Sequence, residues 1–373
     1  MAANTCIEAT AVRAAFAVLP DMTPIRHRRL NQRGPILETW HALCAGRVER
    51  GELDVDECTM NRWISAARGV DPSRLYDGWR SLGIEALDET SFDWPKRLLN
   101  DPQAPVVMFS KGSLRLAGPA VTIVGTRRCS AYGRRVASKL GADLAARGIT
   151  VVSGLALGVD AAAHRGALDT GGEVVGVVGS GLDVVYPRRN RDLWLEVASV
   201  GRLWSEYPPG MRPRSWHFPA RNRILAGLGD VVVVVESGVK GGSLHTVDSA
   251  LERNVTVLAV PGQIDSRASI GTNRLLIQGA TPCTGVEDVL VALGLSAPDA
   301  VDAAISTTPA QLREEDLDAN ERAVLDACGA GAASVSELVL RCGMSLGAVI
   351  EIATRLEMYG VLVNRGGWYE IAK

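Results

Sequence analysis

The sequence predicts an α/β protein built on a doubly wound, mainly parallel sheet, flanked by a small helical N-terminal domain and a C-terminal winged-helix-like domain. Three observations support this fold class. Valine-rich runs alternate with helical segments six times between residues 119 and 294. These runs are almost continuously apolar, which is typical of parallel strands covered by helices on both faces. Three helical segments and a hairpin pattern then occupy residues 318–373.

The segment before the sheet is predicted to be a small helical domain over residues 1–85. Apolar residues recur there with helical periodicity between Pro and Gly breaks. Its stretch IRHRRLNQRGPILETWHAL is basic and then amphipathic, and we expect a fold like that of a SAM or helix-hairpin-helix domain. The stretch SFDWPKRLLNDPQAPVVMFSKGSL leads into the sheet domain, which is predicted at 86–294.

Each predicted strand of the sheet domain is followed by a helical segment. The strands are AVTIVG (120–125), TVVSG (150–154), VVGVVGSG (174–181), GRLWSEY (201–207), VVVVVE (231–236) and VTVLAVPG (255–262). The helical segments include YGRRVASKLGADLAARG, RNRILAGLG and SLHTVDSALERN. Because parallel neighbours need a crossover connection, this alternation indicates βαβ units in one sheet.

Residues 295–317 separate the sheet domain from the C-terminal domain. This stretch is rich in Ala, Pro, Thr and Asp, a composition typical of a linker. In residues 318–373, three short helical segments precede the hairpin VLVNRGGWYEI, whose turn is expected at Asn364 to Gly367. Three helices followed by a β-hairpin form the winged-helix pattern.

The composition excludes several classes of protein. The 373 residues carry a net charge of −2, so no field of the whole protein attracts nucleic acid or a membrane. The seven cysteines are scattered and none forms a CxxC pair, which argues against a disulfide framework and a zinc site. No apolar run in the sequence is long enough to span a bilayer. We expect a soluble, cytoplasmic protein without a metal or a cofactor.

Positive charge gathers at one edge of the predicted sheet. In open α/β sheets, ligands bind beyond the carboxyl ends of the strands. The segments that follow the strands carry Arg127, Arg128, Arg134, Arg135, Arg188, Arg189, Arg191, Arg212, Arg214, Arg221, Arg223 and Lys240. The pattern is densest in WHFPARNRILAGLGDVVVVVE (216–236), where aromatic residues precede two arginines. We therefore expect one positive face at this edge.

Small residues in the same segments indicate an anion site. Gly241, Gly242 and Ser243 come just before a predicted helix, where backbone N–H groups and the helix dipole attract phosphate. A tight strand-to-helix turn would also explain any one of these glycines. The sequence has neither the GxGxxG fingerprint of a dinucleotide site after its first strand nor a Walker A motif. So many arginines favour a repeating polyanion over one small phosphate group.

Aromatic residues beside the arginines favour a single-stranded nucleic acid. Tyr132, Tyr186, Trp216 and Phe218 are such residues. A basic groove with aromatic platforms holds single strands, and each stacked base contributes roughly 1–3 kcal/mol. Packing in the core would explain these rings equally well for Trp216 and Tyr132. For Phe218 we expect a loop position, because Pro219 follows it.

Other polar residues are predicted to have structural roles. His164 is expected to pack or cap within a helix, and Asp160 and Asp183 to cap a helix or fix a turn. His245 and Asp248 lie in one helical segment without a serine or cysteine nucleophile pattern. The sequence therefore predicts no catalytic constellation.

Six ordered motifs resemble the DNA-processing protein A family (DprA, also called Smf). They are VGTRR…YG, SGLALGVDAAAHRGAL, GSGLDVVYP, FPARNRILAGL, GGSLHT and AVPG. The resemblance is dense over residues 90–290, and the flanking domains resemble the family's accessory domains more loosely. It implies a Rossmann-like core, single-stranded DNA binding, a homodimer, and loading of the recombinase RecA onto DNA in natural transformation or a related recombination or repair task.

The resemblance also implies residues of the DNA site. Arg127 and Arg188 match basic positions of that site, and Phe218, Arg221 and Arg223 match its FP-x-RNR motif. The complete set of predicted nucleic-acid-binding residues is Gly125, Thr126, Arg127, Arg128, Gly154, Tyr186, Arg188, Arg189, Arg214, Phe218, Arg221, Asn222, Arg223, Lys240, Gly241, Gly242 and Ser243.

This chain departs from the family pattern in the same region. Leu157 stands where a basic residue is common, and Gly241 and His245 stand in the motif that commonly reads SGSLIT. Leu157 removes a charge near the groove, and the glycine loosens the anion pocket. The resemblance therefore implies a lower affinity than is usual for the family.

The third helix of the C-terminal domain is a poor candidate to contact duplex DNA. SLGAVIEIATRLEMYG sets Arg355 against Glu351 and Glu357, whereas a recognition helix needs net positive charge to meet phosphates. We expect a protein-interaction or dimerisation role for residues 318–373.

An enzyme is the alternative function. Phosphoribohydrolases that act on phosphorylated nucleosides share a Rossmann-like core and a Gly-Gly turn, with a glutamate three residues after the threonine of the turn. Here that position is Ser249, next to Asp248, and the first glutamate is Glu252. A non-enzymatic single-stranded DNA binder is therefore favoured.

Overall fold

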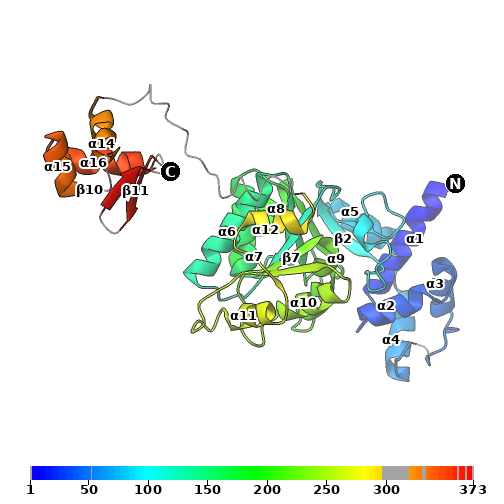
Figure 1. Cartoon of the computed structure of the whole chain (residues 1–373). Coiled ribbons are helices and arrows are strands. Elements are labelled where there is room, and N and C mark those ends of the chain that lie inside the picture. The colour runs from blue at the N-terminus through cyan, green and yellow to red at the C-terminus, as the bar shows by residue number, and fades with distance from the viewer. Residues whose placement is uncertain are drawn as a thin grey trace. The chain divides into compact units, whose positions relative to one another are not determined.

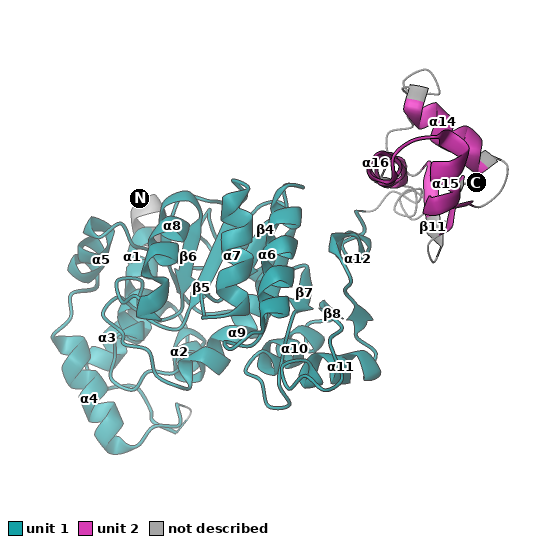
Figure 2. Ribbon diagram, turned by 90° about the vertical axis from the view of Figure 1, so that its left-hand side faces the viewer, with its two compact units in different colours: residues 1–295 teal, residues 296–373 magenta. Residues whose placement is uncertain are grey.

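The computed structural model describes residues 2–51, 53–295, 319–329, 333–358, 361–365 and 368–371. The chain divides into two compact units, residues 1–295 and 296–373 (Figures 1 and 2). Each unit has its own hydrophobic core. Apart from Leu295, the predicted linker at 295–317 lies outside the described residues. No described helix has both the length and the apolar character needed to cross a membrane.

Nine strands within the described residues of the first unit form one sheet in the order β1-β2-β6-β5-β4-β3-β7-β8-β9. The six predicted strands all run parallel, which confirms the predicted parallel sheet. They are β3 (Ala120–Val124), β4 (Thr150–Ser153), β5 (Val174–Val178), β6 (Arg202–Ser205), β7 (Val231–Val234) and β8 (Thr256–Ala259). At the edges, β1 (Glu85–Leu87) and β2 (Met108–Gly112) are antiparallel and β9 (Thr281–Pro282) is parallel.

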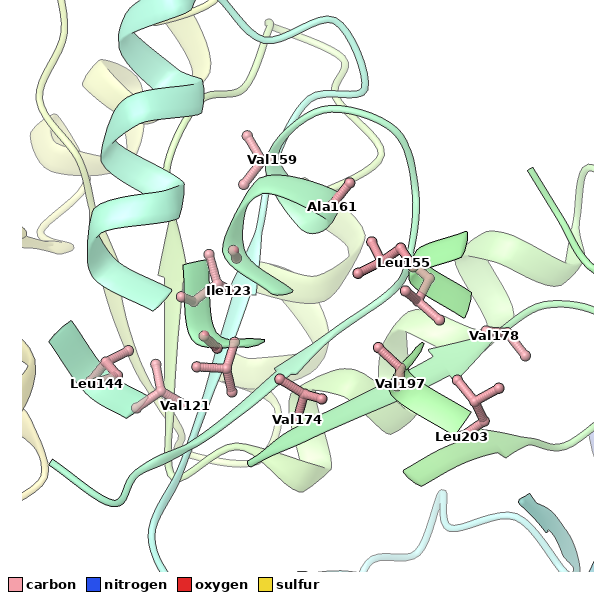
Figure 3. Close-up of a cluster of buried hydrophobic side chains, with 14 of the residues drawn as sticks. Val121, Ile123, Leu144, Leu155, Val159, Ala161, Val174, Val178, Val197 and Leu203 are labelled. Carbon is pink, nitrogen blue, oxygen red and sulfur yellow. The ribbon is translucent and has the colours of Figure 1, made fainter. Parts of the chain in front are cut away.

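Helices cover both faces of this sheet, as the sequence predicts. One layer contains α6 (Ala131–Ala145), α7 (Val159–Asp169), α8 (Arg191–Val200) and α12 (Val286–Ala292). The other contains α9 (His217–Leu228), α10 (Leu244–Leu251) and α11 (Ile270–Ile277). Because side chains alternate along a strand, Val121 and Ile123 of β3 pack under the first layer (Figure 3), and Ala120 and Val124 pack under the second.

The N-terminal segment is helical, as predicted. Its helices are α1 (Ala2–Ala17), α2 (Pro24–Asn31), α3 (Ile36–Cys44), α4 (Glu57–Arg68) and α5 (Pro72–Ser81). They enclose a core in which Phe16 meets Trp40 edge to face, with ring centroids 5.0 Å apart. The segment also contributes to the core of the sheet, where Trp79 packs edge to face on Phe109. Helices and sheet thus share one compact unit, and the domain boundary at residue 85 stays a prediction.

The C-terminal unit has the predicted winged-helix pattern. Its elements are α14 (Ala319–Gly329), β10 (Ala333–Ser334), α15 (Val335–Cys342), α16 (Leu346–Met358), β11 (Leu362–Arg365) and β12 (Trp368–Ile371). The strands form an antiparallel sheet in the order β10-β12-β11. The predicted hairpin turn falls on residues 366–367, which lie outside the described residues. Arg355 of α16 is paired with Glu321 of α14 at 3.2 Å, so its charge is already balanced within the unit.

Candidate nucleic-acid interface

A cleft of about 660 Å³ opens at the carboxyl ends of the parallel strands. The segments after β3, β4, β5, β6 and β7 and the first turns of α9 and α10 form its walls. Twelve of the predicted site residues line it, namely Gly125, Thr126, Arg127, Arg128, Tyr186, Arg214, Phe218, Arg221, Asn222, Gly241, Gly242 and Ser243. The structure thus brings together residues from separate βα units at the edge where α/β sheets bind ligands.

An arginine and two aromatic rings stack in this cleft. The Arg127 guanidinium carbon lies 4.8 Å from the centroid of the Phe218 ring. The Tyr186 and Phe218 rings are 5.5 Å apart and tilted by 38°. An arginine over an aromatic face is held by a cation–π attraction. Since Arg127 and Tyr186 are exposed, this stack offers solvent both a positive charge and a ring face.

The segment that carries Arg127 is fixed by Glu236, a buried residue just after β7. The Glu236 carboxylate accepts hydrogen bonds from the Ser130 backbone N–H (2.8 Å) and from the Ser130 hydroxyl (2.5 Å). The Glu236 carbonyl accepts a further bond from the Thr126 N–H at 2.7 Å. These bonds hold both ends of residues 126–130, so Arg127 and Arg128 project from a fixed backbone.

A buried arginine forms the floor of the cleft. Arg221 is only 4% exposed, and its guanidinium donates to the carbonyls of Gly154 (3.0 Å) and Val177. Burial lowers the pKa of Arg221 to about 10, so the side chain keeps its charge at neutral pH. Burial also raises the pKa of the nearby Asp160 carboxyl, although the charge of Arg221 opposes this shift. The floor therefore combines a cation with a partly compensating acid.

Gly154 is a glycine for a steric reason. A Cβ atom at this position would lie 2.6 Å from a guanidinium nitrogen of Arg221 and 2.6 Å from a carboxylate oxygen of Asp160. No side chain fits there while the buried pair keeps its place. Gly154 does not line the cleft; it lines a smaller cavity of about 50 Å³ behind the stack of Arg127, Tyr186 and Phe218.

The glycine turn before α10 forms another part of the cleft wall. Asn222 of α9 donates from its side-chain amide to the carbonyl of Gly242 at 2.9 Å, which ties the turn to the floor. The Thr246 hydroxyl in the first turn of α10 is buried and has no hydrogen-bond partner among the described residues. The N-terminus of α10 thus borders the cleft with its positive end, an arrangement that favours an anion.

The expectation that Phe218 lies in a loop is wrong. Helix α9 begins at His217, so Phe218 lies in its first turn, where the following Pro219 is tolerated. The helix also separates two arginines that the sequence placed together. Residues two positions apart point about 200° from each other around a helix. Arg221 faces the cleft, whereas Arg223 faces away and donates to Glu206 at 2.6 Å in a buried ion pair.

Three further predicted residues lie outside the lining of the cleft. Arg188 and Arg189 are exposed in the short helix η2 (Arg188–Asn190), and Lys240 is exposed in the turn after β7. Among the polar lining residues, sequence reasoning missed Ser215, His245 and Thr246, and it gave Asp160 only a structural role. The first three could have been included, because each lies within three residues of a predicted site residue.

The remaining residues singled out in the sequence have structural contacts. His164 is buried, with its Nε2 atom 3.1 Å from the Val175 carbonyl, and burial lowers its pKa to about 4. Asp183 accepts a hydrogen bond from the Gly210 N–H at 2.7 Å and so fixes a turn, as expected. The Tyr132 hydroxyl donates to the Pro261 carbonyl at 2.9 Å. Trp216 packs edge to face on the Tyr207 ring rather than into the cleft.

The fold and the cleft define the class of the protein: a Rossmann-like core with a basic, aromatic cleft at the carboxyl edge of its parallel strands, and a winged-helix domain. The chain belongs to the DNA recombination-mediator protein A family. The model of that family matches residues 86–294, and the DprA winged helix domain matches residues 308–367. The resemblance seen in the six motifs is thereby confirmed.

Individual relatives agree with this assignment. A DprA protein of Mycobacterium tuberculosis (strain H37Rv) is 37% identical over 347 residues, which cover 88% of this chain and 87% of the relative. The DNA processing protein DprA of Bacillus subtilis is 38% identical over 218 residues, which cover 58% of this chain and 73% of the relative.

Two solved structures share the fold. The X-ray structure of DNA processing protein A from Streptococcus pneumoniae has a TM-score of 0.64 and 32% identity, and the match covers 75% of this chain and 95% of that chain. A structure of the Helicobacter pylori protein, solved for its single-stranded DNA binding mode, has a TM-score of 0.50 and 30% identity. The match covers 56% of this chain and 95% of that chain.

Proposed function

We propose that this chain is a non-enzymatic, cytoplasmic protein that binds single-stranded DNA in the cleft and acts as a recombination mediator. In this role it loads RecA onto the bound strand, in natural transformation or in a related recombination or repair task. The chain works as a homodimer. The family to which the chain belongs supports the mediator role, and the reported single-stranded DNA binding of the Helicobacter pylori relative supports the choice of ligand.

One observation carries the proposed DNA binding: the stack of Arg127, Phe218 and Tyr186 at the cleft. A single strand presents unpaired bases and phosphates side by side, and the stack presents ring faces and a guanidinium in the same way. The bases of a duplex are stacked inside the helix, so a duplex would contact the guanidinium through its phosphates and would not contact the aromatic rings. The stack therefore favours a single strand over a duplex.

The predicted site residues divide into three groups under this proposal. Those that line the cleft contact bases and phosphates directly. The exposed Arg188, Arg189 and Lys240 contact the backbone of the strand where it leaves the cleft. Arg223 and Gly154 have structural roles, because Arg223 is paired with Glu206 and Gly154 leaves room for Arg221 and Asp160.

The test is the fluorescence anisotropy of a labelled oligo-dT strand across a salt series, with an unlabelled duplex as competitor. We expect binding that weakens as salt rises, because each arginine–phosphate contact releases counterions. Arg127→Glu should abolish most of the binding. Arg47→Glu makes the same charge change at an exposed arginine of the N-terminal segment and should retain it. A folded wild-type chain that does not bind the strand would overturn the proposal, and release of free base from a nucleotide would favour the phosphoribohydrolase alternative.

The mediator role needs its own assay. RecA filament formation on a strand already coated with single-strand-binding protein should become faster when the chain is added, and Arg127→Glu should remove the effect. Sedimentation of the chain at micromolar concentration tests the homodimer. Tight DNA binding without any effect on RecA would contradict the mediator role and leave the DNA binding intact.

A further inference from the structure

One acidic residue of the N-terminal segment reaches an arginine of the cleft. Asp21 lies in the short connection between α1 and α2. One oxygen of its carboxylate is 2.9 Å from the Arg62 guanidinium in α4, and the other is 3.8 Å from the guanidinium of Arg214. Asp21 is thus shared between a helix of the N-terminal segment and the segment that leads into α9.

Arg214 borders two cavities at once. It lines the cleft, and it also lines a small cavity of about 40 Å³ between the N-terminal segment and the sheet, next to Asp21 and Trp216. The Arg214 side chain is 56% exposed and that of Asp21 is 45% exposed. A phosphate in the cleft can therefore reach the same guanidinium that Asp21 now holds.

The backbone of Asp21 lies in the left-handed region, with φ of 53°. Among residues with a side chain, Asp and Asn adopt this conformation most readily. Asp21→Asn therefore removes the charge, and the new side chain tolerates the same left-handed backbone conformation. Asp54 has the same φ of 53°, is exposed in the same N-terminal segment, and forms no ion pair among the described residues.

We propose that Asp21 sets the affinity of the cleft by competing with the DNA backbone for Arg214, an inference that rests on the proposed single-stranded DNA binding. When a phosphate binds Arg214, the long Asp21 contact at 3.8 Å is given up. The shorter contact with Arg62 at 2.9 Å persists, so the carboxylate keeps a partner. Because the released acid stays paired, the competition lowers the affinity without blocking the cleft.

The experiment compares oligo-dT binding by the full chain and its variants across a salt series. Asp21→Asn should bind about two- to fivefold more tightly than wild type, the size expected for the loss of a solvent-exposed ion pair. The slope of log K against log salt should stay close to the wild-type slope, since Arg214 contacts a phosphate in both chains, whereas Arg214→Gln should flatten it by about 0.7. Asp54→Asn makes the same charge change in the same backbone conformation, and it should leave the affinity for oligo-dT and the salt slope unchanged.

A variant that lacks Arg214 shows whether Asp21 lowers the affinity by competing for Arg214 or in some other way. Arg214→Gln alone should weaken binding, and adding Asp21→Asn to it should then have no effect. The proposal is overturned if Asp21→Asn binds as wild type does, if Asp54→Asn gains as much affinity, or if the gain persists without Arg214. A wild-type chain that fails to bind the strand overturns the proposed function itself, which is a different result. Thermal unfolding of each variant checks that the fold is kept.

Discussion

Arg127 and Phe218 come from different βα units, yet the guanidinium of Arg127 lies over the Phe218 ring, 4.8 Å from its centroid. Arg127 follows β3, and Phe218 lies in the first turn of α9. The parallel sheet brings them together because both segments meet at its carboxyl edge. This contact gives the cleft a charged and aromatic surface, and the other features of the site surround it.

The first prediction concerns the aromatic part of this contact. Phe218→Leu keeps an apolar side chain and removes the ring face on which a base can stack. We expect the affinity for oligo-dT to fall by about 1–3 kcal/mol, the usual contribution of one stacked base. Anisotropy titration at constant salt measures the change.

Phe92 provides a matched control for this substitution. Its ring also carries an arginine, with the guanidinium of Arg115 3.7 Å from the centroid, but it lies outside the cleft. Phe92→Leu should leave oligo-dT binding unchanged. An equal loss of oligo-dT affinity in both variants would mean that the effect of Phe218→Leu does not come from base stacking in the cleft.

The second prediction concerns the buried floor. Arg221→Gln removes the buried guanidinium that donates to the carbonyls of Gly154 and Val177. Leaving buried acceptors without their donor typically lowers the free energy of unfolding by about 1–3 kcal/mol. Urea unfolding followed by circular dichroism measures the loss. Arg128→Gln changes an exposed arginine of the same cleft and should retain the wild-type stability. If Arg221→Gln unfolds at the wild-type midpoint, the hydrogen bonds of Arg221 do not stabilise the fold.

The third prediction follows from the pKa of His164, which burial lowers from 6.5 to about 4. The unfolded chain binds a proton at this residue below pH 6.5, while the folded chain keeps it neutral down to about pH 4. Between these values the unfolded state binds more protons, so the free energy of unfolding falls as the pH is lowered. His164 alone contributes a loss on the order of 2–3 kcal/mol across this window.

His164→Gln tests this origin of the pH dependence. Glutamine can still donate to the Val175 carbonyl but does not titrate. Urea unfolding at several values between pH 7.5 and 4.5 should show a smaller loss of stability on acidification than in wild type. The exposed His41 serves as control, and His41→Gln should follow the wild-type curve. Parallel curves for wild type and His164→Gln would rule out His164 as the source.

The fourth prediction concerns the contact between α6 and α7. A Cβ atom at Gly166 of α7 would lie 1.9 Å from the Ser138 carbonyl oxygen of α6. Gly166→Ala must therefore push the two helices apart, and we expect a loss of about 1–3 kcal/mol from overpacking. Gly78 also lies in a helix, α5, and a Cβ atom there meets nothing within 4 Å. Gly78→Ala should instead raise stability by up to about 1 kcal/mol. Thermal unfolding compares the two, and equal effects would contradict the packing argument.

Much of the fold could be predicted from the sequence, because its signals are local. Valine-rich runs predicted the six parallel strands, and their burial on both faces produced that composition. The antiparallel strands β1 and β2 and the short strand β9 gave no comparable signal. They are strands of two to five residues at or next to the edges of the sheet, and their pairing depends on the neighbouring strands and not on their own sequence.

The site could be predicted only in part. The rule that ligands bind at the carboxyl ends of the strands located twelve of the lining residues. It could not say which way a side chain points, because that depends on where a helix begins. With α9 starting at His217, Arg221 and Arg223 fall on opposite sides, and only Arg221 reaches the cleft. The contact between Asp21 and Arg214 was also beyond prediction, since it joins residues far apart in the sequence.

The central claim is that a single strand lies against the stack of Arg127, Phe218 and Tyr186. Photocrosslinking of an oligonucleotide that carries 5-iodouracil, followed by mass spectrometry of the crosslinked peptide, tests this most directly, because the halogenated base reacts with an aromatic ring that it touches. We predict crosslinks at Phe218 or Tyr186 that vanish in Arg127→Glu. Crosslinks confined to residues outside the cleft, such as Phe92 or Trp368, would contradict the claim.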